Sequence, residues 1–155
     1  MTLHGKSFLV SYAPTVDTDA MIAGDSLGTD AKEITDIAPT GQGGVVTGIT
    51  VTNKGITKVP ITLHFFVAEP TNSTITNNLP FAIADADLPL YRGFITLPSD
   101  AEYWKVNANN AVGHIATFYT YVAPEGSFFI VPVTEDGVTF GSVSDLNILL
   151  HLWLD

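Results

Sequence analysis

Apolar residues recur at every second position in several short segments of this chain, and this spacing constrains the fold more than any other feature. The alternation is clearest in residues 61–67, ITLHFFV, and in residues 146–154, LNILLHLWL. Side chains of a β-strand point alternately to opposite faces of a sheet, so this period places one row of each segment against a core. The pattern predicts β-strands, and no segment has a helical period longer than one turn.

Similar segments, each bounded by turn residues, recur along the chain. The predicted strands are 7–13, 45–53, 56–68, 93–97, 103–106, 112–122, 127–134 and 146–154, with short edge strands at 21–22 and 34–37. Asn53, Lys54 and Gly55 predict a hairpin turn between the second and third of these strands, and Pro60 places the third at a sheet edge or bulge. Roughly eight strands with little helix predict an all-β fold, a jelly-roll-like β-sandwich.

The whole chain, residues 1–155, is expected to form one domain, because its length suits a single core and no linker divides it. Residues 1–14 are predicted to be an N-terminal arm or the first strand, and residues 70–90 a long excursion between strands. Strand 112–122 has bulky side chains on both faces, which predicts a central position. Strand 146–154 is also apolar on both faces, so it should be central or covered by a neighbouring subunit.

Charge and composition exclude several classes of partner. The 16 acidic and 6 basic residues give a net charge of −10, which disfavours direct binding to nucleic acid and to anionic membranes. No apolar run approaches the length of about 20 residues that spans a bilayer. The first six residues do not resemble a signal peptide, so synthesis in a cytoplasm is expected. The absence of cysteine rules out disulfides and thiolate chemistry.

The residues that could carry chemistry form no recognisable motif, and we predict that the protein is not an enzyme and needs no cofactor. The four histidines are scattered, which favours structural roles over a metal site. Asp85 and Asp87 are weak candidates for calcium, but their neighbours Ala84, Ala86 and Leu88 suit a helical turn or an Asx-turn better. Acidic side chains could still meet in space as a hydrolase pair, although no spacing selects one.

Aromatic and apolar residues supply the candidates for a binding surface. Tyr91, Tyr103, Trp104 and Trp153 could form a platform on which a sugar stacks. In a β-sandwich, however, such residues more often lie in the core or at a subunit contact. The residues predicted to contact a second subunit or a larger assembly are Leu149, His151, Trp153, Tyr103 and Trp104.

Four stretches, AGDSLG (23–28), GQGGVVTGITVTN (41–53), NNLPFAIADADL (77–88) and FGSVSDLNILL (140–150), give the chain a resemblance to a known family. In this order they resemble a family of small virion proteins of tailed bacteriophages, and the segments IADADL and SVSDLNILL are the most specific. The resemblance implies a head decoration or accessory structural role without catalytic residues. The chain differs from the family pattern at 77–80 and 151–155, where partner contacts would lie.

The sequence therefore leads to two functional hypotheses. The first is a non-enzymatic capsid decoration or cement protein, a homotrimer that binds the major capsid protein on the virion surface. The alternative is a carbohydrate-binding or receptor-binding β-sandwich module of a virion or secreted protein, with Tyr91, Tyr103 and Trp104 as its stacking platform.

Overall fold

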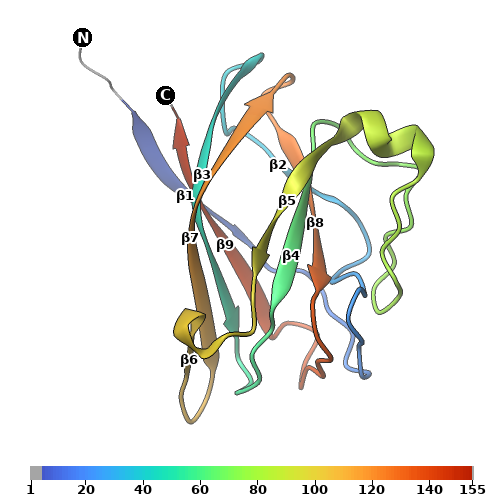
Figure 1. Cartoon of the computed structure of the whole chain (residues 1–155), viewed down its shortest axis with the longest axis vertical. Coiled ribbons are helices and arrows are strands. Elements are labelled where there is room, and N and C mark those ends of the chain that lie inside the picture. Colours follow the sequence, from blue (N-terminus) through green and yellow to red (C-terminus); the bar gives the residue numbers. More distant parts are fainter. Residues whose placement is uncertain (1–4, 155) are drawn as a thin grey trace.

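A computed structural model describes residues 5–154 as two antiparallel sheets packed face to face (Figure 1). The strands are β1 (Lys6–Tyr12), β2 (Lys32–Ile34), β3 (Gln42–Asn53), β4 (Ile61–Phe66), β5 (Tyr91–Leu97), β6 (Trp104–Val106), β7 (Ala111–Ala123), β8 (Phe128–Thr134) and β9 (Leu146–Leu154), with 3₁₀-helices η1 (Asp85–Leu90) and η2 (Ala101–Tyr103). One sheet has the order β1-β9-β3-β7-β6 and the other β2-β8-β4-β5. The prediction of an all-β sandwich is confirmed, with nine strands in the described residues.

The core lies between the two sheets and is built from the alternating positions. Ile148, Leu150 and Leu152 of β9 are fully buried and belong to one cluster with Leu63 and Phe65 of β4. Because each buried side chain of this size contributes about 1.5–3 kcal/mol, the period-two pattern is the main determinant of the sandwich.

The predicted hairpin at 53–55 is wrong. β3 pairs with β7 and β9, whereas β4 pairs with β5 and β8 in the other sheet, so residues 54–60 cross between the layers. The Asn53 side chain holds this crossing, since its Oδ1 accepts from the Gly55 N–H at 3.1 Å and its Nδ2 donates to the Thr57 carbonyl at 2.8 Å. Pro60 lies before the strand, and β4 is an inner strand rather than an edge.

Three smaller predictions also need correction. Strand β7 has β3 on one side, but β6 pairs only with residues 111–113, so most of β7 is an edge and not central. The short strand predicted at 34–37 lies at 32–34, and Met21 forms a single bridge to Val138. Residues 6–12 form a strand beside β9, and the rest of the predicted arm, residues 1–4, lies outside the described residues.

The excursion between β4 and β5 folds back over the outer face of the four-stranded sheet (Figure 1). A second, smaller core forms there around Phe66, Val131 and Val133, on which Phe81 and Ile83 of the excursion pack. The chain thus covers part of the outer face of one sheet with its own residues, although Phe94 of β5 stays 59% exposed. The outer face of the five-stranded sheet is the remaining candidate for a binding surface.

Candidate interaction surface

The four long strands of the five-stranded sheet carry almost no charge. Among the residues of β1, β3, β7 and β9, Lys6 is the one Asp, Glu, Lys or Arg. All 16 acidic residues therefore lie outside these strands, although the chain has a net charge of −10. The acidic residues are thus concentrated in the other elements and in the loops.

We call the outward side of this sheet the outer face and define it by the alternating residues that do not point into the core. They are Leu9 and Ser11 of β1, Leu149, His151 and Trp153 of β9, Thr50 and Thr52 of β3, and Val112, His114, Ala116 and Phe118 of β7. Phe118 is 78% exposed, Leu9 59% and Trp153 42%. Large exposed apolar side chains on one sheet face are typical of interaction sites.

Two histidines meet at the centre of the outer face. Thr50 Oγ1 lies 2.9 Å from His114 Nδ1 and 2.9 Å from His151 Nε2, and the two rings are 5.4 Å apart in an edge-on arrangement. Burial and, to a lesser extent, the neighbouring His114 lower the pKa of His151 below its ordinary value. His151 is therefore neutral at physiological pH, and a neutral imidazole can both donate and accept a hydrogen bond.

Three of the predicted interface residues lie together on this face. Leu149, His151 and Trp153 are successive outward residues of β9, and β1 and β3 flank them. Trp104 is not part of the surface, because it is only 4% exposed and its Nε1 donates to the Pro98 carbonyl at 2.7 Å. Tyr103 packs half-buried against the main core.

The predicted aromatic platform does not form. Trp104 is buried in the five-stranded sheet, whereas Tyr91 lies on the four-stranded sheet, where its ring packs 5.3 Å from that of Phe66. The burial of Trp104 removes the largest stacking surface from the sugar-binding hypothesis. The remaining two rings belong to different elements, Tyr91 to β5 of the four-stranded sheet and Tyr103 to η2, which precedes β6 of the other sheet.

Asp85 and Asp87 take different positions on η1, and the predicted helical turn is present. Asp85 is exposed, while Asp87 is buried and accepts hydrogen bonds from the N–H of Asn72 at 2.9 Å, from Nδ2 of Asn72 at 3.0 Å and from Oγ of Ser73 at 2.7 Å. The bonds from Ser73 and Asn72 lower the pKa of the Asp87 carboxyl. Both carboxylate oxygens of Asp87 thus bind η1 to Asn72 and Ser73 near the start of the excursion, and we call this hydrogen-bonded group the clasp.

Asp87→Asn is expected to loosen the excursion, because an amide replaces a charged acceptor and turns N–H groups toward the donors of Asn72 and Ser73. Cleavage within residues 67–90 by a dilute protease at pH 7 should become roughly tenfold faster. The pKa of the Asp87 carboxyl is lowered in the folded state. The hydrogen bonds of Asp87 therefore stabilise the fold at pH values above the ordinary carboxyl pKa, and this stabilisation is lost as the pH falls through the folded pKa. Asp85→Asn is the matched control, and equal acceleration by both variants would contradict the clasp.

The described residues offer neither a metal site nor a helix that could span a membrane. Within residues 5–154, no three His, Cys, Asp or Glu side chains gather closely enough to hold a metal ion. The described part of the chain also contains no helix with the length and apolar character needed to cross a membrane. No protein-family model matches the chain, and no curated protein matches it significantly.

The sequence analysis missed Leu9, Thr50, His114 and Phe118. The register that joins Thr50, His114 and His151 involves three strands that are far apart in the sequence. One available signal was the lack of charge in segments 45–53, 112–122 and 146–154, compared with the acids concentrated elsewhere. That signal identifies the sheet, although not the residues that meet on it.

Proposed function

We propose that this protein is a non-enzymatic structural protein of a tailed-phage virion, which binds the capsid surface as a homotrimer and stabilises the shell. The observation that carries the proposal is the outer face of the five-stranded sheet, which carries no acidic residue and whose one basic residue outside the four long strands is Lys105 of β6. The resemblance of residues 23–28, 41–53, 77–88 and 140–150 to phage virion proteins supplies the biological setting.

Charge distribution favours a second copy of this chain as the partner on the outer face. Copies with a charge of −10 repel one another wherever their acids approach. The outer face carries no acid, so contact there avoids this repulsion. Thr50, Thr52 and the histidine pair can supply hydrogen bonds, and Leu9, Trp153 and Phe118 supply apolar area.

The size of the face suits a specific contact. Four strands about 4.8 Å apart, each contributing about eight residues at about 3.3 Å, span roughly 500 Å². In a trimer the contact is heterologous, so the outer face of one copy meets a different surface of the next copy. Two surfaces of this size together reach the roughly 1,000 Å² that separates specific interfaces from most incidental contacts. Burial of the exposed aromatic side chains Phe118 and Trp153 would provide much of the free energy of such a contact.

The mechanism of shell stabilisation would be binding alone. A protein that binds the assembled shell but not its dissociated subunits stabilises the shell by mass action. A trimer would match a local threefold position of the major capsid protein, and three linked contacts would raise the effective affinity far above that of one. No bond is made or broken in this function, which agrees with the absence of a catalytic motif in the sequence.

The test compares two phenylalanines on opposite sheets. Phe118, 78% exposed, lies on the outer face, while Phe94, 59% exposed, lies on β5 of the other sheet. We expect the wild type and Phe94→Asp to form a trimer by light scattering. Phe118→Asp should weaken association roughly 30-fold or more, because a buried aromatic contributes about 2 kcal/mol or more.

Co-sedimentation with purified phage shells measures the second half of the proposal. The trimeric proteins should pellet with shells, and the Phe118→Asp variant should remain largely in solution. A wild-type protein that stays monomeric at all concentrations and does not pellet with shells would contradict the proposal. A trimer that Phe118→Asp leaves intact would exclude the outer face as the subunit contact.

A further inference from the structure

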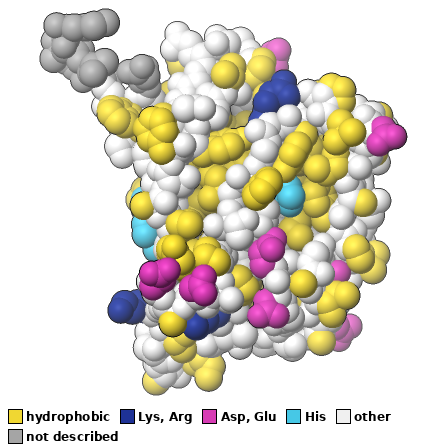
Figure 2. All heavy atoms as spheres, in the orientation of Figure 1, with side chains coloured by type: hydrophobic (Ala, Val, Ile, Leu, Met, Phe, Trp, Pro, Cys, Tyr) yellow, Lys and Arg dark blue, Asp and Glu magenta, His cyan; other side chains and the backbone are white. Residues whose placement is uncertain are grey.

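A pocket opens between the two sheets, on the side where neither sheet continues. β5 is the last strand of the four-stranded sheet, and β7 has no strand beside it there, because β6 pairs only with residues 111–113. The pocket has a volume of about 130 Å³ and is lined mainly by aromatic side chains, including Phe65, Phe66, Tyr119, Tyr121 and Phe128. Figure 2 shows hydrophobic side chains gathered across the middle of this side of the molecule.

The two tyrosines turn an apolar surface to the pocket because their hydroxyl groups are engaged elsewhere. The Tyr119 hydroxyl donates to the Arg92 carbonyl at 2.8 Å, and the Tyr121 hydroxyl donates to the Ile37 carbonyl at 3.1 Å. Burial raises the pKa of each tyrosine to about 12, so both stay neutral over the physiological range. The lining thus offers ring faces to a ligand and no anionic group.

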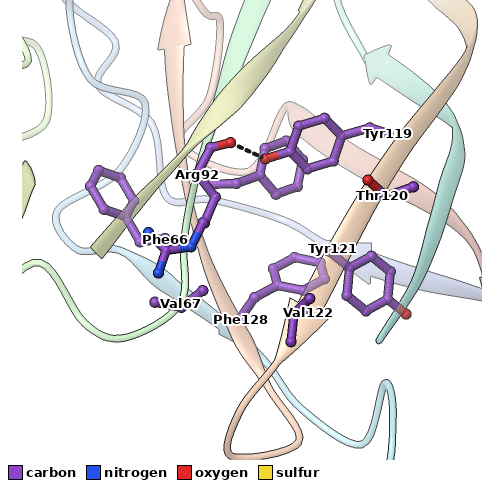
Figure 3. A pocket seen from close by; sticks show the side chains of 9 residues that line it. Phe66, Val67, Arg92, Tyr119, Thr120, Tyr121, Val122 and Phe128 are labelled. Atoms are coloured by element: carbon purple, nitrogen blue, oxygen red, sulfur yellow. Dashed lines mark hydrogen bonds between the residues drawn. The ribbon is translucent and has the colours of Figure 1, made fainter. Parts of the chain in front are cut away.

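Arg92 is the one charged residue in the lining, and the backbone is shaped to place it there. The pairing of β4 with β5 shifts register at this point, from Phe65 opposite Gly93 to Phe66 opposite Tyr91, which leaves Arg92 as a bulge residue. Gly93 follows in a left-handed conformation, with φ of 119°. Bulges commonly redirect a side chain, and Figure 3 shows the Arg92 side chain running past Phe66 with its guanidinium toward Val67.

The guanidinium is held by its own strand but keeps free donors. Arg92 Nη1 donates to the carbonyls of Pro89 at 2.8 Å and Tyr91 at 2.9 Å. This anchoring leaves Nε and Nη2, the pair that binds a carboxylate with two parallel hydrogen bonds. In a chain with only 6 Lys and Arg residues, a fixed cation beside an aromatic pocket favours an anionic ligand with an apolar body.

We propose that this pocket binds a small aromatic carboxylate, with the ring among Phe65, Tyr121 and Phe128 and the carboxylate on Arg92. The volume of about 130 Å³ supports this size, because cavities of about 150 Å³ lined by apolar side chains accept a benzene ring. The charge of Arg92 supports the carboxylate. This binding activity is separate from the proposed role of the outer face, and it needs neither a trimer nor a capsid.

The experiment is a titration of the isotope-labelled protein by NMR with 3-phenylpropanoate and with its neutral amide. We expect saturable shifts of the Val67 and Val122 methyl signals, with a Kd on the order of 1 mM for the acid. Arg92→Gln should weaken binding of the acid roughly tenfold and leave binding of the amide nearly unchanged. Val122→Phe should block both compounds by filling the mouth of the pocket.

Each measurement in this experiment tests a different part of the proposal. Equal affinity for the acid and the amide, or an acid affinity that Arg92→Gln leaves intact, would overturn the assignment of the carboxylate to Arg92. Shifts confined to residues away from the pocket, or no saturation by about 10 mM acid, would overturn the pocket itself. Amide signals elsewhere in the spectrum report whether each variant keeps the wild-type fold.

Discussion

Trp104→Ala is expected to lower the free energy of unfolding by about 3–5 kcal/mol, the usual cost of removing a large aromatic side chain from a core. Trp104 is 4% exposed, belongs to the main core and lies flat on Gly113, where an added Cβ would come within 2.8 Å of the indole. The substitution also leaves the Pro98 carbonyl without its indole donor. Both losses act at β6, the three-residue strand that closes one end of the sheet.

The matched control is the other tryptophan of the chain. Trp153 is 42% exposed on the outer face, so Trp153→Ala should change the stability of the isolated subunit by less than about 1 kcal/mol. Urea unfolding followed by far-ultraviolet circular dichroism measures both variants without relying on tryptophan fluorescence. Dilute protein keeps subunit association out of the comparison. Similar losses in the two variants would contradict the assignment of Trp104 to the core.

The contrast between the two tryptophans also explains which parts of the fold were predictable. β3, β7 and β9 are long, with 12, 13 and 9 residues. The alternation of their side chains over these lengths predicts which ones point inward. β6 has three residues, too few for a period, so the sequence could not separate a core tryptophan from a surface one. The prediction of Trp104 as an interface residue failed for this reason.

Sheet membership was harder to predict than strand position. Turn residues at 53–55 describe the local chain direction, and they do not determine whether the next strand joins the same sheet. The Asn53 side chain stabilises a crossing instead of a hairpin, because it bonds as far as Thr57. The second core was hidden for a related reason, since Ile75, Phe81 and Ile83 pack from an irregular segment without a repeating period.

The candidate surface was predictable only in part. Leu149, His151 and Trp153 were identified because β9 is apolar on both faces, and the inner row alone is needed for the core. Phe118 was assigned to a buried strand, since a central position for β7 was the simplest explanation of its bulk. In the structure the Phe118 side chain is exposed, and exposed apolar side chains of this size are typical of surfaces that contact a partner.

His64 is expected to make the protein less stable in mild acid, by about 1–2 kcal/mol between pH 7 and pH 5. The ring is half-buried on the outer side of β4, 4.8 Å from Phe81, with Nδ1 3.1 Å from the Tyr91 hydroxyl. Burial lowers its pKa to about 4, and the charge of Glu135 offsets only part of this effect. The expected loss of stability is smaller than the full pKa shift from about 6.5 would give, because the side chain keeps some contact with solvent.

The sign of this pH dependence follows from the number of protons that the folded and unfolded states bind. Between pH 6.5 and pH 4 the unfolded chain protonates His64 while the folded chain does not, so the unfolded state binds more protons and stability falls as the pH falls. His64→Phe keeps an aromatic ring beside Phe81 and should reduce the dependence of unfolding free energy on pH between 7 and 5. The part that comes from His151, whose pKa is also lowered, should remain. If His64→Phe retains the wild-type slope, acid destabilisation arises from other groups, and the histidine beneath the excursion is not its cause.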